Sequence, residues 1–158
     1  MYRLFGLFLL LILLDQVAKY LVLDSGMASI CNAGVAWGNV ALPLWANVAL
    51  TAVALLLGAL LAWPTLSASP MRLVAALGWV LILTGGVSNL LDKAVRGCVV
   101  DFLPLPWVPA FPWYNIADMY LTIGVVLLIG SEIVYNEKAG STNSELPGEE
   151  RTKNIEIK

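Results

Sequence analysis

Four long apolar segments constrain the fold of this chain more than any other feature of its sequence. An α-helix needs about 20 mostly apolar residues to cross the hydrocarbon core of a membrane. The segments that meet this requirement are Leu4–Leu23, Ala41–Trp63, Met71–Leu91 and Trp113–Tyr135. The sequence therefore predicts an all-α membrane protein with four transmembrane helices, in which residues 1–135 form one domain.

The amount and placement of charge agree with a lipid environment. The chain is 59% hydrophobic and only 13% charged, which leaves too little charge to cover the surface of a soluble protein of this size. Nine of the 20 charged residues lie in 137–158. We expect residues 136–158 to form a polar, disordered tail. The net charge of −2, with no basic stripe, argues against a nucleic-acid partner.

The chain contains no histidine. It therefore lacks the usual general base near neutral pH and the commonest metal ligand, and it cannot form a Ser-His-Asp or Cys-His arrangement. Cys31 and Cys98 are isolated thiols, which argues against zinc and iron–sulfur sites. We expect no metal and no cofactor. The sequence leaves open whether the two cysteines form a disulfide, which would require both to face an oxidising compartment.

Four spans would place both termini on the same side of the membrane. Arg3, Arg72 and Lys138 would lie near the membrane on that side, and Lys93 and Arg96 on the other. Because cytoplasmic segments carry an excess of Lys and Arg, this bias favours cytoplasmic termini. The first apolar segment is interrupted by polar residues and is long for a signal-peptide core, so we do not interpret it as a cleaved leader.

Two ionisable residues lie within the first apolar segment. A charged side chain at the centre of a bilayer costs about 3 kcal/mol on insertion scales, so it needs a partner or a function. Asp15 and Lys19 are four residues apart and share a helix face. They can be interpreted as a self-neutralising structural pair, or as the support of a polar site near the outer membrane surface.

A second polar cluster begins within the end of the third apolar segment and continues beyond it. Asn89 precedes Asp92 by three residues and Lys93 by four, so the three side chains project from one side of a helix. Asp92 with Lys93 or Arg96 can be a simple ion pair at the boundary. Asp101 is harder to explain structurally, because apolar residues flank it on both sides.

A third cluster opens the fourth apolar segment, where Asn115 and Asp118 are three residues apart. Asp118 can be a structural carboxylate that the dipole favours at the start of a helix. The topology nevertheless places it on the same side as Asp101, only 17 residues away. We therefore expect Asp101 and Asp118 to face each other.

Two close carboxyl groups in a partly dry site cannot both ionise easily, so one has a raised pKa and stays protonated. The ionised group can act as general base on a water molecule, while the protonated group polarises a carbonyl and later protonates a leaving amine. This is the chemistry of an aspartic protease, and it needs neither histidine nor metal. The spacing alone does not distinguish it from a proton relay or a magnesium site.

Three other functions fit the sequence less well. A proton-coupled transporter or channel predicts polar residues at mid-membrane depth along several helices, whereas here they gather toward one surface. A phosphotransferase with Asp-bound magnesium needs more carboxylates and more cations. A serine/lysine peptidase would use Ser88 and Lys93, but residues five apart on a helix point about 140° away from each other.

Four motifs follow one another along the chain: DQVAKY at 15–20, NAGVAWG at 32–38, GGVSNLLDKAVRGCVVDF at 85–102 and FPWYNIADMY at 111–120. In this order they resemble the lipoprotein signal peptidase (signal peptidase II) family, and with the four spans the resemblance covers residues 1–135. It implies a membrane aspartic endopeptidase that removes signal peptides from diacylglyceryl-modified bacterial prolipoproteins by cutting before the lipidated cysteine. It also implies a monomer in the bacterial cytoplasmic (inner) membrane, in contact with membrane lipids, with its active site near the outer face.

The resemblance assigns the catalytic roles to Asp101 and Asp118. The positions that it assigns to substrate binding or support of the site are Asp15, Lys19, Asn32, Gly34, Asn89, Asp92, Lys93 and Asn115. The loop that contains Asn32 and Gly34 would form part of a small β-rich extracytoplasmic cradle. Lys93 stands where the family usually has Arg and lacks its two-pronged geometry, which puts in doubt how Asp92 is held. Ser88 and Trp37 take positions often held by Gly and Phe.

Overall fold

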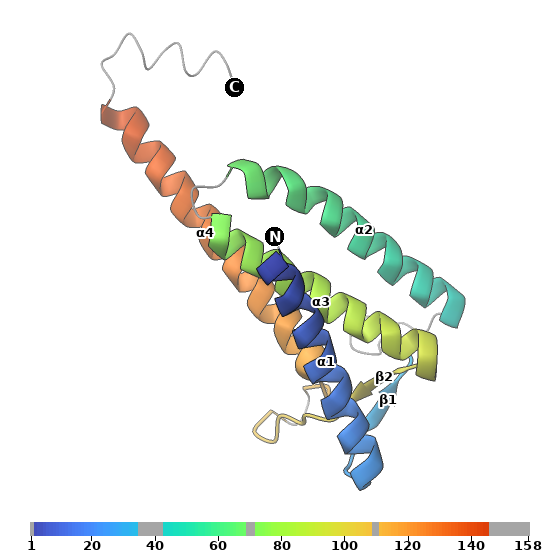
Figure 1. Ribbon diagram of the computed structural model, residues 1–158. Helices are drawn as coiled ribbons and strands as arrows, with labels where there is room; N and C mark the ends of the chain where they lie inside the picture. Colours follow the sequence, from blue (N-terminus) through green and yellow to red (C-terminus); the bar gives the residue numbers. More distant parts are fainter. Residues whose placement is uncertain (1, 35–42, 69–71, 109–110, 146–158) are drawn as a thin grey trace.

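The computed structural model of the chain describes residues 2–34, 43–68, 72–108 and 111–145 (Figure 1). The helices in these ranges are α1 (Tyr2–Ser25), α2 (Leu44–Ala68), α3 (Arg72–Arg96) and α4 (Ile116–Glu145). The strands are β1 (Ile30–Asn32) and β2 (Val99–Asp101). Trp37 lies outside the described residues. The architecture is therefore mostly helical with one small sheet, as the sequence predicts.

Among the described residues, three stretches of helix are long and apolar enough to cross a membrane: Tyr2–Ser25, Leu73–Arg96 and Ile116–Tyr135. The helix α2 is 25 residues long. Its described apolar stretch, Leu44–Gly58, is shorter than these spans. Among the described residues, length and composition thus identify three membrane helices and do not by themselves assign α2 as a fourth.

The helix α3 is the centre of the bundle and packs against α1, α2 and α4. Its contact with α4 depends on glycines, because small residues let two backbones approach closely. A Cβ atom built on Gly85 would lie 2.3 Å from the carbonyl oxygen of Ala117. A Cβ atom built on Gly124 would lie 2.7 Å from the carbonyl oxygen of Gly78. These two positions fix how near α4 lies to α3.

The strands β1 and β2 form a two-stranded antiparallel sheet with Ile30 opposite Asp101 and Asn32 opposite Val99. The sheet lies at the end of the molecule where α1 and α3 end and α2 and α4 begin (Figure 1). Beyond β2, Leu103 pairs with Tyr114 in an isolated antiparallel bridge. This bridge closes the intervening loop and brings Asp101, on one side of it, toward the start of α4.

The end of α4 differs from the sequence-based expectation. The fourth apolar segment ends at Tyr135, and the sequence predicts disorder from residue 136. The structure instead continues the helix to Glu145. Glu137, Lys138 and Ala139 all have high helix propensity, so an established helix can extend beyond the apolar segment. Residues 146–158 lie outside the described part of the chain.

Candidate active site

Polar side chains from all four helices and both strands converge at the end of the molecule that contains the sheet. Six of them are fully buried: Asp15, Lys19, Asn47, Ser88, Asp92 and Asn115. Asp101 and Lys93 are also buried, while Asn32, Asn89 and Asp118 are partly exposed. Every buried side-chain nitrogen and oxygen in the described residues has a hydrogen-bond partner. The cluster is therefore a complete polar network and not a collection of stranded charges.

Asn115 and Asp118 cap the start of α4. The backbone N–H of Asn115 donates to Asp118 Oδ2 (3.1 Å), and the backbone N–H of Asp118 donates to Asn115 Oδ1 (3.0 Å). This reciprocal pair is a capping box, which satisfies backbone donors that a helix start leaves free. The other oxygen of Asp118 accepts a hydrogen bond from the Asn89 amide (2.8 Å). Both oxygens of the carboxylate are thus oriented by groups of the chain.

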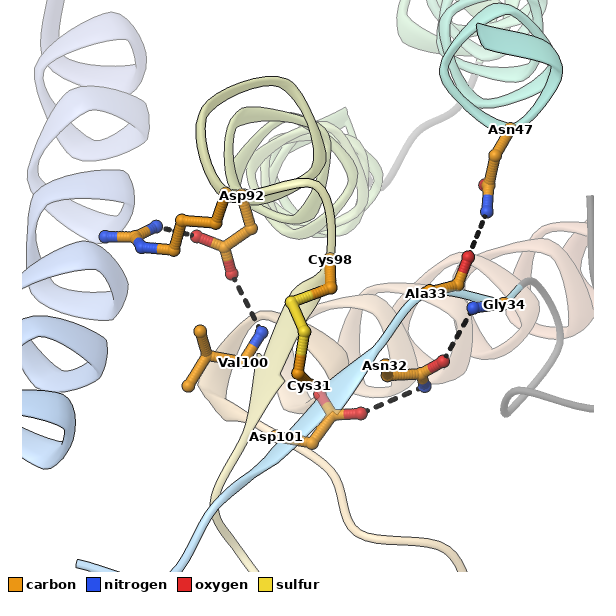
Figure 2. Close-up of a disulfide and its surroundings, with 10 residues drawn as sticks. Cys31, Asn32, Ala33, Gly34, Asn47, Asp92, Cys98, Val100 and Asp101 are labelled. Atoms are coloured by element: carbon orange, nitrogen blue, oxygen red, sulfur yellow. Dashed lines mark hydrogen bonds and ion pairs between the residues drawn. A yellow bond between two sulfur atoms is a disulfide. The ribbon is translucent and has the colours of Figure 1, made fainter. Parts of the chain in front are cut away.

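Asn115 also connects this helix start to Asp101. Its side-chain amide donates to Asp101 Oδ1 (2.7 Å) and to Asn89 Oδ1 (3.2 Å). The second oxygen of Asp101 accepts a hydrogen bond from the Asn32 amide (3.0 Å), as Figure 2 shows. Asp101 and Asp118 therefore lie on either side of one residue, Asn115, which donates to both. The structure brings together the two aspartates that the sequence singles out.

The pKa of Asp101 depends on its burial and on its charged and hydrogen-bonding neighbours. Burial raises the pKa of the Asp101 carboxyl above its usual value, and the nearby negative charge of Asp118 raises it further. The amides of Asn32 and Asn115 oppose this shift, because they donate to the ionised form, and so does the charge of Lys19. The pKa of Asp101 is raised on balance, since desolvation is the largest of these effects.

Lys19 is the central cation of the network. Its Nζ lies 2.7 Å from Asp15 Oδ2, 2.7 Å from Asp92 Oδ2 and 3.0 Å from Asn89 Oδ1. Asp15 in turn accepts hydrogen bonds from Ser88 Oγ (2.6 Å) and from the backbone N–H of Ala117 (2.9 Å). The intrahelical pair of Asp15 and Lys19 thus exists, and it also supports the start of α4 and the amide that contacts Asp118.

Lys93 and Asp92 have different partners, which answers the doubt raised by the Lys93 position. Lys93 Nζ donates to the Asn47 side-chain oxygen (2.6 Å). Asp92 forms ion pairs with Lys19 and Arg96 and accepts a hydrogen bond from the Gln16 amide (3.0 Å). Asp92 is therefore held without Lys93, and Lys93 instead connects α3 to α2.

Two residues of the network were missed by the sequence analysis as members of the site. The Asn47 amide donates to the Ala33 carbonyl oxygen (2.8 Å), which ties α2 to the segment after β1 (Figure 2). Gln16 bridges Ser88 and Asp92. Asn47 could have been found as a lone amide in an apolar segment, where a polar group needs a partner.

The structure places Gly34 next to the proposed site, because its backbone N–H donates to Asn32 Oδ1 (3.1 Å).

A cavity of about 380 Å³ adjoins this network. The residues that line it are Leu105, Phe111, Tyr114, Asp118, Met119, Thr122 and Ile123. Asp118 is the one ionisable carboxyl in an otherwise largely apolar wall. Within the described part of the chain, no three Asp, Glu, Cys or His side chains are arranged to hold a metal ion. The arrangement places Asp118 at the wall of a largely apolar space.

Comparisons of the sequence with known proteins agree on one family. The family model described as signal peptidase (SPase) II matches residues 7–134. The lipoprotein signal peptidase of Brevibacillus brevis is 35% identical over 133 residues, which are 75% of this chain and 87% of that protein. The lipoprotein signal peptidase of Bacillus subtilis is 34% identical over 135 residues, 76% of this chain and 86% of that protein. A solved bacterial membrane enzyme superimposes with a TM-score of 0.73 at 25% identity, covering 93% of this chain and 94% of that structure.

Proposed function

The chain belongs to the signal peptidase II family, and from this we propose that it is an aspartic endopeptidase of bacterial prolipoproteins. Its substrates carry a diacylglyceryl group on the acceptor cysteine, and the enzyme cuts the peptide bond before that cysteine. The observation that supports this proposal most directly is the single bridging residue between the two carboxylates. Asn115 donates to Asp101 through its side chain and to Asp118 through its backbone.

The proposed mechanism uses one proton shared by the pair. The ionised carboxylate accepts a proton from a water molecule, whose oxygen attacks the scissile carbonyl carbon. The protonated carboxyl donates a hydrogen bond to the carbonyl oxygen and stabilises the charge that develops there. The C–N bond then breaks as the leaving amine takes a proton from the pair. The raised pKa of Asp101 supports such a shared proton.

Substrate access follows from the apolar cavity. Asp118 lines this space together with Leu105, Phe111 and Ile123. We propose that it receives an apolar part of the substrate next to the scissile bond. A substrate anchored by acyl chains and by its own apolar signal helix can reach the site laterally from the bilayer. Membrane lipids therefore surround the enzyme while it acts. We propose that the enzyme acts as a monomer.

The small sheet supports a four-span topology. Because β1 pairs with β2, the ends of α1 and α3 lie on the same side of the membrane. The helix α3 spans the membrane, so its first residue lies on the opposite side. The chain must therefore cross back between β1 and α3, and α2 is the helix available for this crossing. We propose cytoplasmic termini and a site near the outer face of the bacterial cytoplasmic membrane.

A cleavage assay with two matched substrates tests this function. Purified enzyme in detergent is given a diacylglyceryl-modified prolipoprotein, or the same precursor without lipid, each with and without a metal chelator. We expect cleavage of the lipidated precursor alone, at the same rate in chelator, with a lipidated cysteine at the new N-terminus by mass spectrometry. Failure to cut a fully lipidated precursor, or loss of cleavage in chelator, would contradict the proposal.

A further inference from the structure

A disulfide between Cys31 and Cys98 joins the two strands of the sheet, beside the proposed catalytic Asp101 (Figure 2). Cys31 is the central residue of β1 and pairs with Val100, and Cys98 immediately precedes β2. The two Cα atoms are 5.4 Å apart. The bond thus connects segments separated by 67 residues at the one place where they form a sheet.

The sheet is too small to fix its own register. Each strand has three residues, and an isolated two-stranded sheet is marginally stable in water. A slip of one residue would turn every side chain of a strand to the opposite face. The disulfide removes this freedom, because Cys31 can be bonded to Cys98 only while β1 and β2 lie side by side.

The register matters because Asn32 must reach Asp101. These two side chains lie on the same face of the sheet as diagonal neighbours, since Asn32 pairs with Val99 and Asp101 with Ile30. The Asn32 amide donates to Asp101 Oδ2 (3.0 Å). Cys31 precedes Asn32 directly and points to the other face, as alternation along a strand requires. The disulfide and the hydrogen bond therefore brace opposite faces of the same short ladder.

We propose that the Cys31–Cys98 disulfide is a positioning element of the active site, which holds the Asn32 amide on the Asp101 carboxylate and makes catalysis depend on its oxidised state. This inference rests on the proposed function. Formation of the bond transfers two electrons and two protons from the two thiols to a disulfide oxidant, which is reduced to two thiols. A dithiol reverses it by thiol–disulfide exchange: the reductant becomes a disulfide, and Cys31 and Cys98 become thiols. Such a bond persists only on the extracytoplasmic side.

The test compares purified wild type before and after reduction with dithiothreitol, with free thiols counted by alkylation and mass spectrometry. We expect reduction to lower kcat by about tenfold or more, because the hydrogen bond to a charged carboxylate is lost, with KM little changed. Reoxidation should restore kcat. The pH limb that reflects Asp101 should move to higher pH in the reduced enzyme. The Cys31→Ala/Cys98→Ala double variant should resemble reduced wild type and should not respond to the reductant.

A second readout does not depend on catalysis. Amide hydrogen exchange at 30–32 and 99–101 should become faster on reduction, while exchange in the centre of α3 stays unchanged. Two free thiols in the untreated enzyme would overturn the proposal, as would a reduced enzyme with unchanged kcat, pH profile and exchange. If the oxidised enzyme does not cut the lipidated precursor at all, the proposed function fails, and the exchange measurement alone decides whether the disulfide positions Asp101.

Discussion

Asn115 and Asp118 combine a structural role at the start of α4 with a place in the proposed active site. Asp118 Oδ2 completes a capping box with Asn115, and the same carboxylate lines the cavity. The interpretation of Asp118 as a helix-start carboxylate and its interpretation as a site residue are therefore compatible. Asn115 uses its backbone N–H and its side-chain oxygen for the cap, and its side-chain NH₂ group donates to Asp101. A residue that fixes the start of α4 thus also fixes the distance between the two carboxylates.

Loss of the Asn32 amide should change the pH dependence of the enzyme. Asn32 donates to Asp101 and lowers the pKa of that carboxyl, against the raising effect of burial. In an Asn32→Ala variant the pKa of Asp101 should rise further, so the limb of the kcat/KM profile that reflects Asp101 should move to higher pH. Ser25→Ala is a suitable control, because it removes a side-chain hydrogen bond to the Val22 carbonyl oxygen in the last turn of α1. An unchanged limb in Asn32→Ala would mean that the amide does not tune Asp101.

The residues of the proposed site could be predicted from the sequence, whereas most of their hydrogen-bond and ion-pair partners could not. The motifs identify Asp101, Asp118 and the surrounding polar positions, because ionisable side chains in apolar segments are conspicuous. They do not show that Lys93 binds Asn47 and that Asp92 binds Lys19 and Arg96. Those choices depend on how the helices are rotated and packed, which spacing along one helix does not specify.

At the scale of elements, the contact between α3 and α4 determines where Asp118 lies. Gly85 faces the backbone of Ala117, the residue before Asp118. A Cβ atom there would meet a carbonyl oxygen at 2.3 Å, and a backbone atom cannot move aside without displacing the start of α4. The glycine is therefore as important for the position of the carboxylate as the residues that bind it.

A Gly85→Ala variant should be destabilised by about 1–3 kcal/mol, as for other overpacked contacts, and should lose activity because the start of α4 shifts. Gly130→Ala is a matched control on α4, since a Cβ atom at Gly130 would meet nothing within 4 Å. The control should keep wild-type activity and gain slightly in stability from its helix propensity. Thermal unfolding in detergent and the cleavage assay measure both effects. Equal behaviour of the two variants would contradict the close approach of α3 and α4.

The helices could be predicted from their apolar segments, whereas the strands could not be placed by residue. Three-residue strands carry almost no periodic signal. Their pairing of Ile30 with Asp101 depends on how the ends of α1 and α3 meet. The helical continuation of α4 to Glu145 was likewise not visible in the hydropathy, since most of its residues are polar.

At the scale of the whole molecule, the topology gathers the three polar clusters of the apolar segments at one end. The ends of α1 and α3, the starts of α2 and α4 and the small sheet all meet there (Figure 1). Large apolar side chains such as Leu13, Leu56 and Val126 are exposed along the helices. This is the distribution expected of a helix bundle surrounded by lipid, and we propose that the active site lies near one membrane surface.

Tags inserted into the chain should report this topology. We expect an epitope tag between Ala68 and Arg72, or after Lys158, to be protected from protease added to spheroplasts, and a tag after Val108 to be digested. Western blotting of each tag gives the result, and detergent lysis is the control for accessibility. Digestion of the tag between Ala68 and Arg72 in intact spheroplasts would show that α2 does not cross the membrane.

The most direct test of the aspartate pair is the kcat of three isosteric variants on the diacylglyceryl-modified precursor. Asp101→Asn and Asp118→Asn remove the proposed catalytic groups, and Asp24→Asn is the control at an exposed aspartate of α1. All three variants should show a cooperative thermal unfolding transition in detergent, which verifies that they are folded. We expect each catalytic variant to lose about 10³-fold or more in kcat, the scale of acid–base catalysis, and Asp24→Asn to match wild type. A folded Asp101→Asn or Asp118→Asn enzyme that keeps wild-type kcat would contradict the account.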